Sequence, residues 1–182
     1  MSISDELRRR AQAVKLLAID VDGVWTDGSL YYGARGEELK RFDVRDGQGM
    51  VLWRELGFPT AILTARTSPI VATRASELGI RYVLQGERDK GRGFEKLIAQ
   101  AGVRAEEVAY MGDDINDIPV LRMAGLAATP ADCVDEVREI VHYVCKAKGG
   151  HGAIRELCEL LIRSKDRWGE ATAKYLEAKA SA

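Results

Sequence analysis

Two carboxylates stand at the end of a short apolar run near the start of the chain. Residues 16–19 are apolar, and Asp20 and Asp22 follow them directly, with Gly23 behind. Such a run indicates a buried strand that delivers both acids at its carboxyl end, the edge where open α/β sheets bind ligands. Because neighbouring carboxylates repel each other unless a cation neutralises them, the pair predicts a site for a hard divalent ion such as Mg²⁺.

Further polar residues stand beside later apolar runs, in a fixed order. Thr64 ends the run at residues 60–63, Lys90 precedes a helix-like segment, and Asp113 and Asp117 follow the run at 108–111. Taken singly, each is ordinary: a turn threonine, a solvated lysine, an aspartate that caps a helix. A parallel sheet gathers such residues at one edge, so their joint occurrence favours a single site.

The elements that would position this site alternate between strand and helix. We expect strands at residues 16–20, 60–64, 82–85, 108–112, 126–128 and 143–144. We expect helices near residues 49–56, 69–78, 91–101, 118–123, 134–141 and 153–163. This alternation predicts an α/β fold in which helices flank a parallel sheet.

Residues 29–45 do not follow this alternation of strands and helices. Two β-like runs, at 29–32 and 39–44, flank a glycine-bearing turn and predict a β-hairpin. The apolar residues of so small a hairpin cannot all be buried within it. The stretches from Asp22 to Thr64 and from Thr64 to Lys90 have no room for a further inserted domain. A site without such a cover is open to water unless another subunit covers it.

Length, composition and net charge exclude several classes of protein. A chain of 182 residues with 46% hydrophobic and 30% charged residues is expected to form one domain over residues 1–182, with a tail from about residue 148. A net charge of -1 provides no basic field for nucleic acid or membrane. The three cysteines suggest reduced core thiols. The first fourteen residues lack the apolar segment of a signal peptide, so we expect a cytoplasmic protein with no membrane span.

Together these residues resemble the four sequence motifs of phosphatases in the haloacid dehalogenase (HAD) superfamily. Asp20 and Asp22 match the first motif, Thr64 the second and Lys90 the third. Asp113 and Asp117 match the acids of the fourth. The resemblance runs roughly from residue 16 to residue 144, and it implies a Rossmann-like core without a cap.

The resemblance also implies a role for each residue. Asp20 would be the nucleophile and Asp22 the general acid and base, while Thr64 and Lys90 would hold the phosphate. Mg²⁺ would be bound by Asp20, by Asp113 and by the backbone carbonyl of Asp22. Asp114 and Asp117 would orient other groups, Asp117 acting on Lys90 or on metal-bound water.

A narrower resemblance joins residues 20–28, 42–47, 112–114 and 148–156 to phosphatases of 3-deoxy-D-manno-octulosonate 8-phosphate (KDO 8-phosphate). It implies a phosphatase of lipopolysaccharide precursor synthesis. It also implies a homotetramer in which the hairpin packs at subunit interfaces, a neighbour walls the active site and the glycine-rich segment helps to close it.

Three further residues are candidates for contact with a substrate that carries a phosphate and a carboxylate. Arg66 follows Thr64 and is expected near the phosphate pocket, and Arg74 matches an arginine of the family. For Arg74 a solvated helix face is an equal alternative. His151 stands where these phosphatases usually carry arginine, and an ordinary loop histidine is the favoured alternative for it.

Alternative functions remain open on the sequence. Phosphatases of the nine-carbon acid KDN 9-phosphate share the opening motif but tend to carry an acid at the position of Arg66. A broad sugar-phosphate phosphatase and a non-catalytic oligomerisation module are further alternatives. The segment from Lys165 onward is expected either to pack Trp168 and Tyr175 on a neighbour as a helix or to fray.

Overall fold

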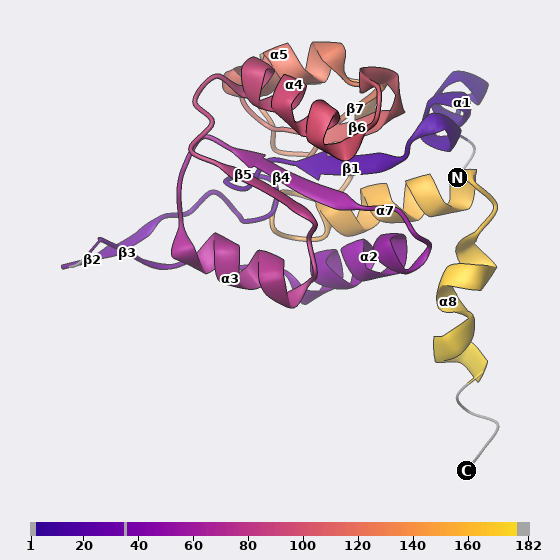
Figure 1. The fold of residues 1–182 in the computed structure, drawn as a ribbon, viewed down its shortest axis with the longest axis horizontal. Helices are drawn as coiled ribbons and strands as arrows, with labels where there is room; N and C mark the ends of the chain where they lie inside the picture. Colours follow the sequence, from indigo (N-terminus) through magenta and orange to yellow (C-terminus); the bar gives the residue numbers. More distant parts are fainter. Residues whose placement is uncertain (1–2, 35, 178–182) are drawn as a thin grey trace.

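The structure, a computed structural model, describes residues 3–34 and 36–177. A parallel sheet of six strands has the order β5-β4-β1-β6-β7-β8, and β2 and β3 form a separate antiparallel pair (Figure 1). The strands are β1 (Leu16–Ile19), β2 (Tyr31–Gly33), β3 (Gly36–Leu39), β4 (Thr60–Thr64), β5 (Tyr82–Gln85), β6 (Val108–Met111), β7 (Leu126–Thr129) and β8 (Tyr143–Val144). The helices are α1 (Asp5–Ala13), α2 (Val44–Glu55), α3 (Pro69–Glu77), α4 (Lys90–Ala101), α5 (Ile118–Met123), α6 (Asp135–Arg138), α7 (Ala153–Ser164) and α8 (Trp168–Glu177), with short 3-10 turns at Ala105–Glu107 and Ile115–Asp117.

The α/β class predicted from the alternation is confirmed, and so is the parallel sheet. Every expected strand of the main sheet is present, with ends that differ by at most one residue. Among the described residues, only the hairpin, α2 and β4 lie between the first two motifs, and only α3 and β5 before Lys90. No cap domain is inserted there, as expected.

Several predicted boundaries were wrong. The second hairpin strand was expected at residues 39–44, but β3 covers Gly36–Leu39 and α2 begins at Val44 rather than near residue 49. The reason is a helix cap, because the side chain of Asp43 accepts a hydrogen bond from the backbone N–H of Arg45. The helix expected at 134–141 shrinks to α6. The helix α1 was not predicted.

Residues of the central strand β1 alternate between two hydrophobic layers. Leu17 and Ile19 face the layer that contains α1, α2, α3 and α7. Leu16 and Ala18 face the layer that contains α4, α5 and α6. Figure 1 shows α4 and α5 on one side of the sheet and α2, α3 and α7 on the other. Burial on both faces explains why the central strands β1 and β6 are apolar throughout, whereas the edge strand β5 is only partly buried.

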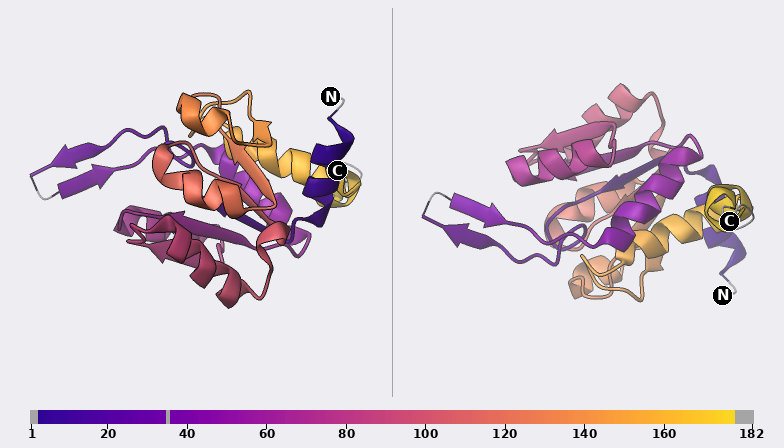
Figure 2. Two further views of the ribbon diagram at one scale, coloured as in Figure 1. Left: turned by 90° about the horizontal axis from the view of Figure 1, so that it is seen from above. Right: turned by 90° about the horizontal axis from the view of Figure 1, so that it is seen from below.

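The hairpin of β2 and β3 extends away from the sheet and helices (Figure 2). Its large apolar side chains are exposed, as expected for so small an element: Leu30, Tyr31, Tyr32 and Leu39. The hairpin and α8 lie at opposite ends of the molecule (Figures 1 and 2).

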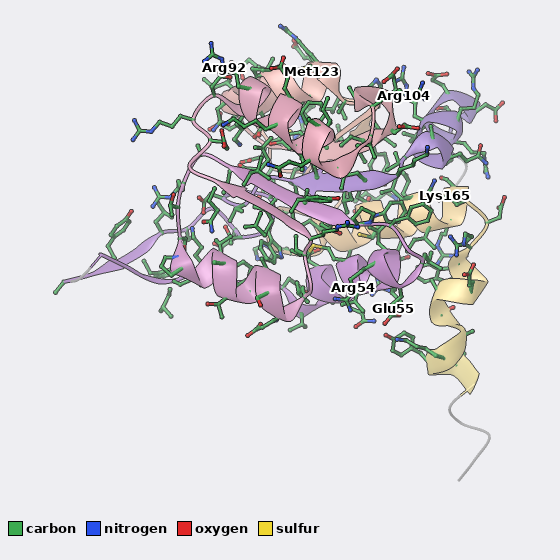
Figure 3. All side chains as sticks on the ribbon, in the orientation of Figure 1. Arg54, Glu55, Arg92, Arg104, Met123 and Lys165 are labelled. Carbon is green, nitrogen blue, oxygen red and sulfur yellow. The ribbon has the colours of Figure 1, made fainter. Side chains whose placement is uncertain are left out.

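The C-terminal segment forms a helix on its own chain. Trp168 packs against the core, with the Arg163 guanidinium 4.0 Å from the centroid of its ring. Lys174 pairs with Glu55, which Figure 3 labels at the end of α2 near α8. The hydroxyl of Tyr175 accepts a hydrogen bond from Gln48. The helical alternative therefore holds up to residue 177, with Trp168 packed on its own chain, and residues 178–182 lie outside the described part.

Two further expectations concern burial and membranes. All three cysteines are free and buried, in line with the expected core thiols. Within residues 3–34 and 36–177, no helix combines the length and apolar character needed to cross a membrane.

The glycine-rich segment before α7 packs tightly against the turn that follows β1. A Cβ atom on Gly149 would lie 1.8 Å from the carbonyl oxygen of Gly23, so only glycine fits there. The buried carboxylate of Asp46 accepts hydrogen bonds from the backbone N–H groups of Gly152 (3.1 Å) and Arg155 (2.8 Å). A side chain from α2 thus caps α7 and fixes the segment between them.

We predict that Asp46→Ala lowers the free energy of unfolding by about 1–3 kcal/mol, because two N–H groups at the start of α7 lose their acceptor. Urea denaturation followed by circular dichroism measures this change. Asp135→Ala is the matched control, since Asp135 is an exposed acid in the first turn of α6. Equal losses for the two variants would contradict the capping role of Asp46.

Candidate active site

Asp20 lies directly beyond β1, at the carboxyl edge of the sheet. Its backbone N–H donates to the carbonyl of Met111 (2.9 Å), which continues the pairing of β1 with β6. Asp20 is only 5% exposed. Its Oδ2 atom lies 3.0 Å from Nζ of Lys90, while Oδ1 is buried without a partner. Burial raises the pKa of Asp20 to about 6, although the Lys90 ammonium lowers it.

Lys90 is the first residue of α4, which places it inside the helix that was expected to follow it. Its buried ammonium lies 2.6 Å from Oδ1 of Asp117, in addition to its contact with Asp20. Burial lowers the pKa of Lys90, but the two carboxylates raise it by more, so the net shift is upward. Lys90 therefore stays charged inside the protein.

Asp117 is fully buried, and both of its oxygens have partners. Oδ1 accepts from Lys90 and from the Tyr110 hydroxyl (2.5 Å). Oδ2 accepts from the backbone N–H groups of Asp113 (3.1 Å) and Asp114 (3.4 Å). A carboxylate engaged in this way has little capacity left for a metal ion. The arrangement suits a residue that orients Lys90.

Asp113 follows β6 and approaches the turn after β1 from the neighbouring strand. A Cβ atom on Gly23 would lie 2.0 Å from Oδ2 of Asp113, and Gly23 has a φ of +87°. Glycine is therefore required there for conformation and for space. The Oδ1 atom of Asp113 is buried without a partner. Burial is the largest cause that raises the pKa of Asp113, to about 8, and the charges of Asp20 and then Asp117 add to it.

These carboxylates form a potential cation site. Asp20, Asp113 and Asp117 each place one oxygen so that the three atoms lie within 4.8 Å of one another. Only one ammonium, that of Lys90, pairs with the group among the described residues. Excess negative charge and two unpartnered buried oxygens fit a hard divalent ion held through oxygen. The structure brings Asp20 and Asp113 together, as expected. Asp117 instead accepts a hydrogen bond from Lys90 and orients it.

The carboxylate of Asp22 contacts different cations. Its Oδ1 contacts Nζ of Lys40, and its Oδ2 lies 3.4 Å from Nε of Arg66. Arg66 also donates to the hydroxyl of Tyr32 in the hairpin (2.6 Å). The expected metal contact of Asp22 is through its backbone carbonyl, and it stays a prediction. Side-chain contacts instead link Asp22 to the hairpin and to the end of β4.

Thr64 ends β4, the strand that pairs with β1 on the side opposite β6. Its side chain is nearly buried, and Oγ1 accepts a hydrogen bond from the backbone N–H of Arg66 (3.4 Å). Asp20, Thr64 and Asp113 therefore follow the carboxyl ends of three adjacent strands, where the order of the sheet reverses.

The other candidates lie in surrounding segments. Arg74 pairs with Glu77 on the same helix, with Nη1 2.8 Å from the carboxylate. Asp114 is exposed, and its carboxylate accepts from the N–H of Ile115. His151 donates from Nδ1 to the carbonyl of Gly149 (2.8 Å) and accepts at Nε2 from Arg41 (3.1 Å). Asp114 is joined to the central carboxylates through its backbone N–H, which donates to Asp117, whereas the contacts described here for Arg74 and His151 do not reach them.

Sequence reasoning missed Lys40, Tyr32 and Tyr110. A tyrosine inside an apolar run needs a partner for its hydroxyl, so Tyr110 carried a usable signal. Lys40 and Tyr32 carried none, because charged and aromatic residues are ordinary in an exposed hairpin.

Comparison with known proteins places this geometry in a family. The sequence profile of haloacid dehalogenase-like hydrolases matches residues 43–125. The 3-deoxy-D-manno-octulosonate 8-phosphate phosphatase of Yersinia pestis is 41% identical over 170 residues, which cover 93% of this chain and 91% of the relative. Its crystal structure superposes with a TM-score of 0.88 over 91% of this chain and 89% of that one.

A second solved structure contains ligands. The 3-deoxy-D-manno-octulosonate 8-phosphate phosphatase of Moraxella catarrhalis, in complex with a magnesium ion, a phosphate ion and a KDO molecule, is 35% identical. It superposes with a TM-score of 0.91 over 95% of this chain and 99% of that one. The similarity therefore covers nearly the full length of both proteins.

We predict that Mg²⁺ stabilises the protein and does so more strongly at pH 8 than at pH 6. Asp20 and Asp113 have folded-state pKa values of about 6 and about 8 against an ordinary 3.8. The protonated forms of these two acids stabilise the folded state, fully so below about pH 4. This stabilisation is lost as pH rises through the folded-state pKa values, which leaves the ionised acids as a penalty. A dication removes this penalty, so we expect an increase in Tm of roughly 5 °C or more at pH 8.

Thermal unfolding in EDTA and in Mg²⁺, at both pH values, measures this effect. Asp113→Asn is the control, because it removes a charge and an open oxygen from the group. A Tm that Mg²⁺ leaves unchanged at pH 8 would contradict the cation site.

Proposed function

The chain belongs to the family of KDO 8-phosphate phosphatases within the haloacid dehalogenase-like hydrolases, and we propose that it hydrolyses KDO 8-phosphate to KDO and inorganic phosphate. One observation carries the proposal: a buried carboxylate with a free oxygen, Asp20, lies beside Lys90 and Asp113 at the carboxyl edge of the sheet. In bacteria that make lipopolysaccharide, this reaction supplies KDO as a precursor.

The two residues with open buried oxygens, Asp20 and Asp113, would hold Mg²⁺ together with the backbone carbonyl of Asp22. When bound, the ion shields the anionic nucleophile from the anionic ester and neutralises charge on the phosphoryl group. Lys90 supplies fixed positive charge on the other side of Asp20. This arrangement makes attack of one anion on another feasible.

In the first half of the reaction, a carboxylate oxygen of Asp20 attacks phosphorus and forms an aspartyl-phosphate. The bond between phosphorus and the sugar oxygen breaks, and its electron pair stays with that oxygen. Asp22 gives the oxygen a proton, so KDO leaves as an alcohol. Thr64 and Lys90 hold the phosphoryl oxygens, and one such preorganised contact is worth about 2.7–4 kcal/mol of barrier.

In the second half, water attacks the phosphorus of the aspartyl-phosphate. Asp22, now a carboxylate, accepts a proton from the water as the new bond between phosphorus and oxygen forms. The bond between phosphorus and Asp20 breaks, inorganic phosphate leaves, and Asp20 regains its charge. Asp117 keeps Lys90 in place throughout, because both of its oxygens are committed to that network.

Arg66 supports a substrate with a second anionic group. Its side chain is 43% exposed and lies beside Asp22, so it is accessible to a ligand at the site. We propose that Arg66 contacts the substrate directly. Arg74 and His151 would contact the substrate from the surrounding segments. A guanidinium suits the carboxylate of KDO 8-phosphate as well as its phosphate.

We also propose that the chain is one domain, that it assembles as a homotetramer and that it works in the cytoplasm. Both hydrophobic layers lie on one sheet, which supports a single domain. The exposed apolar residues of the hairpin need a partner surface, which supports assembly. The three buried free cysteines support a reducing compartment.

The alternatives are a KDN 9-phosphate phosphatase, a broad phosphatase and a non-catalytic module. Arg66, in place of the acid expected in KDN 9-phosphate phosphatases, favours KDO 8-phosphate. A module without activity would not need Asp20, Asp22, Thr64 and Lys90 all to be present.

We predict that kcat/KM for KDO 8-phosphate exceeds that for KDN 9-phosphate and common sugar phosphates by on the order of 10²-fold or more. A phosphate-release assay measures these values with Mg²⁺ and with EDTA, which should abolish turnover. Equal efficiency on all substrates would indicate a broad phosphatase, and absence of turnover would indicate a module.

We predict that Asp20→Asn lowers kcat at least about 10⁴-fold, because an amide cannot form the aspartyl-phosphate. The change is nearly isosteric, so circular dichroism should show that the variant keeps the fold. Mass spectrometry of acid-quenched reactions should find the phosphorylated form only with Asp20 in place. Full turnover by Asp20→Asn would rule out a covalent mechanism.

A further inference from the structure

A lysine from the hairpin contacts the carboxylate proposed to transfer protons. Lys40 directly follows β3, and its side chain has no exposed surface. Its Nζ atom contacts Oδ1 of Asp22, whose side chain is 21% exposed. The other oxygen of Asp22 lies 3.4 Å from Nε of Arg66. The carboxylate is therefore held from two sides by cations from different parts of the chain.

We propose that Lys40 is a positioning residue that holds Asp22 in the orientation needed for proton transfer. This inference rests on the proposed function, because it concerns how Asp22 performs its part of that reaction. It assigns to the hairpin a role inside the active site of its own subunit.

The location of Asp22 explains why such a contact is needed. Asp22 lies in the turn beyond the end of β1, so no strand pairing fixes it. A side chain placed in a turn retains rotamer freedom, and proton transfer requires it within hydrogen-bond reach of one oxygen atom. A charged partner that is itself immobile removes that freedom.

Lys40 and Arg66 differ in how they can act. The ammonium of Lys40 is enclosed by protein, so it is not open to a substrate anion. Arg66 is 43% exposed, also donates to Tyr32, and is the residue proposed to contact substrate. When Arg66 turns to a substrate anion, the contact of Lys40 with Asp22 is the one that persists. An enclosed pair is also screened less by salt than an exposed one.

The hairpin reaches this site from both of its strands. Tyr32 lies in β2 and accepts a hydrogen bond from Arg66, whereas Lys40 follows β3 and contacts Asp22. The two strands pair with each other, with Tyr31 opposite Leu39, so the contacts come from one unit. The position of the hairpin thereby becomes a determinant of where the Asp22 carboxylate lies.

The choice of leaving group separates this role from a general loss of structure. Release of an alkyl alcohol needs a proton from Asp22, whereas p-nitrophenolate leaves as a stable anion and needs none. The bond changes at phosphorus are the same for both esters, and Asp20 is phosphorylated in each case. Water must then lose a proton to Asp22 before phosphate is released, whichever ester was used.

The test is a double-mutant cycle with Lys40→Met and Asp22→Asn. On KDO 8-phosphate we expect Lys40→Met to lower kcat by on the order of 10²-fold. In the Asp22→Asn background, the same change should lower kcat less than about 3-fold, because its target is gone. With p-nitrophenyl phosphate, Lys40→Met should give a rapid burst of nitrophenolate close to one per site, followed by slow turnover.

Two controls keep the test decisive. Lys96→Met removes an exposed lysine of α4 that pairs with Glu87, which precedes that helix, and it should leave kcat within about 2-fold. Lys40→Arg retains a cation, so its loss should be smaller than that of Lys40→Met and should also vanish in the Asp22→Asn background. Circular dichroism and Tm establish that each variant is folded. If Lys40→Met does not fold, the same cycle is run with Lys40→Arg.

The outcomes separate the inference from the function on which it rests. If the unchanged protein hydrolyses neither KDO 8-phosphate nor p-nitrophenyl phosphate, the proposed function fails. If it is active and the effects of the two substitutions multiply, Lys40 acts independently of Asp22 and the inference is overturned. Equal losses on both esters without a burst would likewise overturn it.

Discussion

The structure depends on one electrostatic constraint: three carboxylates, of which Asp20 and Asp117 are buried and Asp113 is partly buried, face a single buried ammonium. Lys90 pairs with Asp20 and Asp117, while Asp113 takes part in none of the described ion pairs. Burial makes the ionised state of these acids costly, and it raises the pKa of Asp20 to about 6 and of Asp113 to about 8. A bound dication would neutralise this excess of negative charge.

The fold tolerates this constraint because neighbouring groups fix each carboxylate. Asp117 uses both oxygens on Lys90, Tyr110 and the backbone of the fourth motif. Asp113 is pressed against a glycine with no room for a side chain. The parallel sheet supplies the common edge, since β1, β4 and β6 are adjacent. Burying these anions costs stability locally, and the two hydrophobic layers on the faces of the sheet offset that cost.

The hairpin contributes two side chains beside the uncapped site. Its large apolar side chains are exposed, yet Lys40 contacts Asp22 and Tyr32 accepts a hydrogen bond from Arg66. The segment from Gly149 to Gly152 packs against the same turn. Its backbone is hydrogen-bonded to the side chains of Asp46 and Arg41. Elements far apart in sequence thus converge on the turn that carries Asp22.

The sequence by itself determined the sheet, the motifs and their order. Strands buried on both faces are apolar throughout, and their carboxyl ends carry the reactive residues, so Asp20, Thr64 and Asp113 were identifiable from local pattern. The start of α2 was misplaced although Asp43 offered a local cap signal, because the β-like run before it suggested a longer strand. Only the tertiary structure decided which carboxylate contacts which cation. Lys40 with Asp22, Tyr110 with Asp117 and Asp46 with α7 are contacts set by packing, and neither periodicity nor propensity encodes the partner of a buried charge.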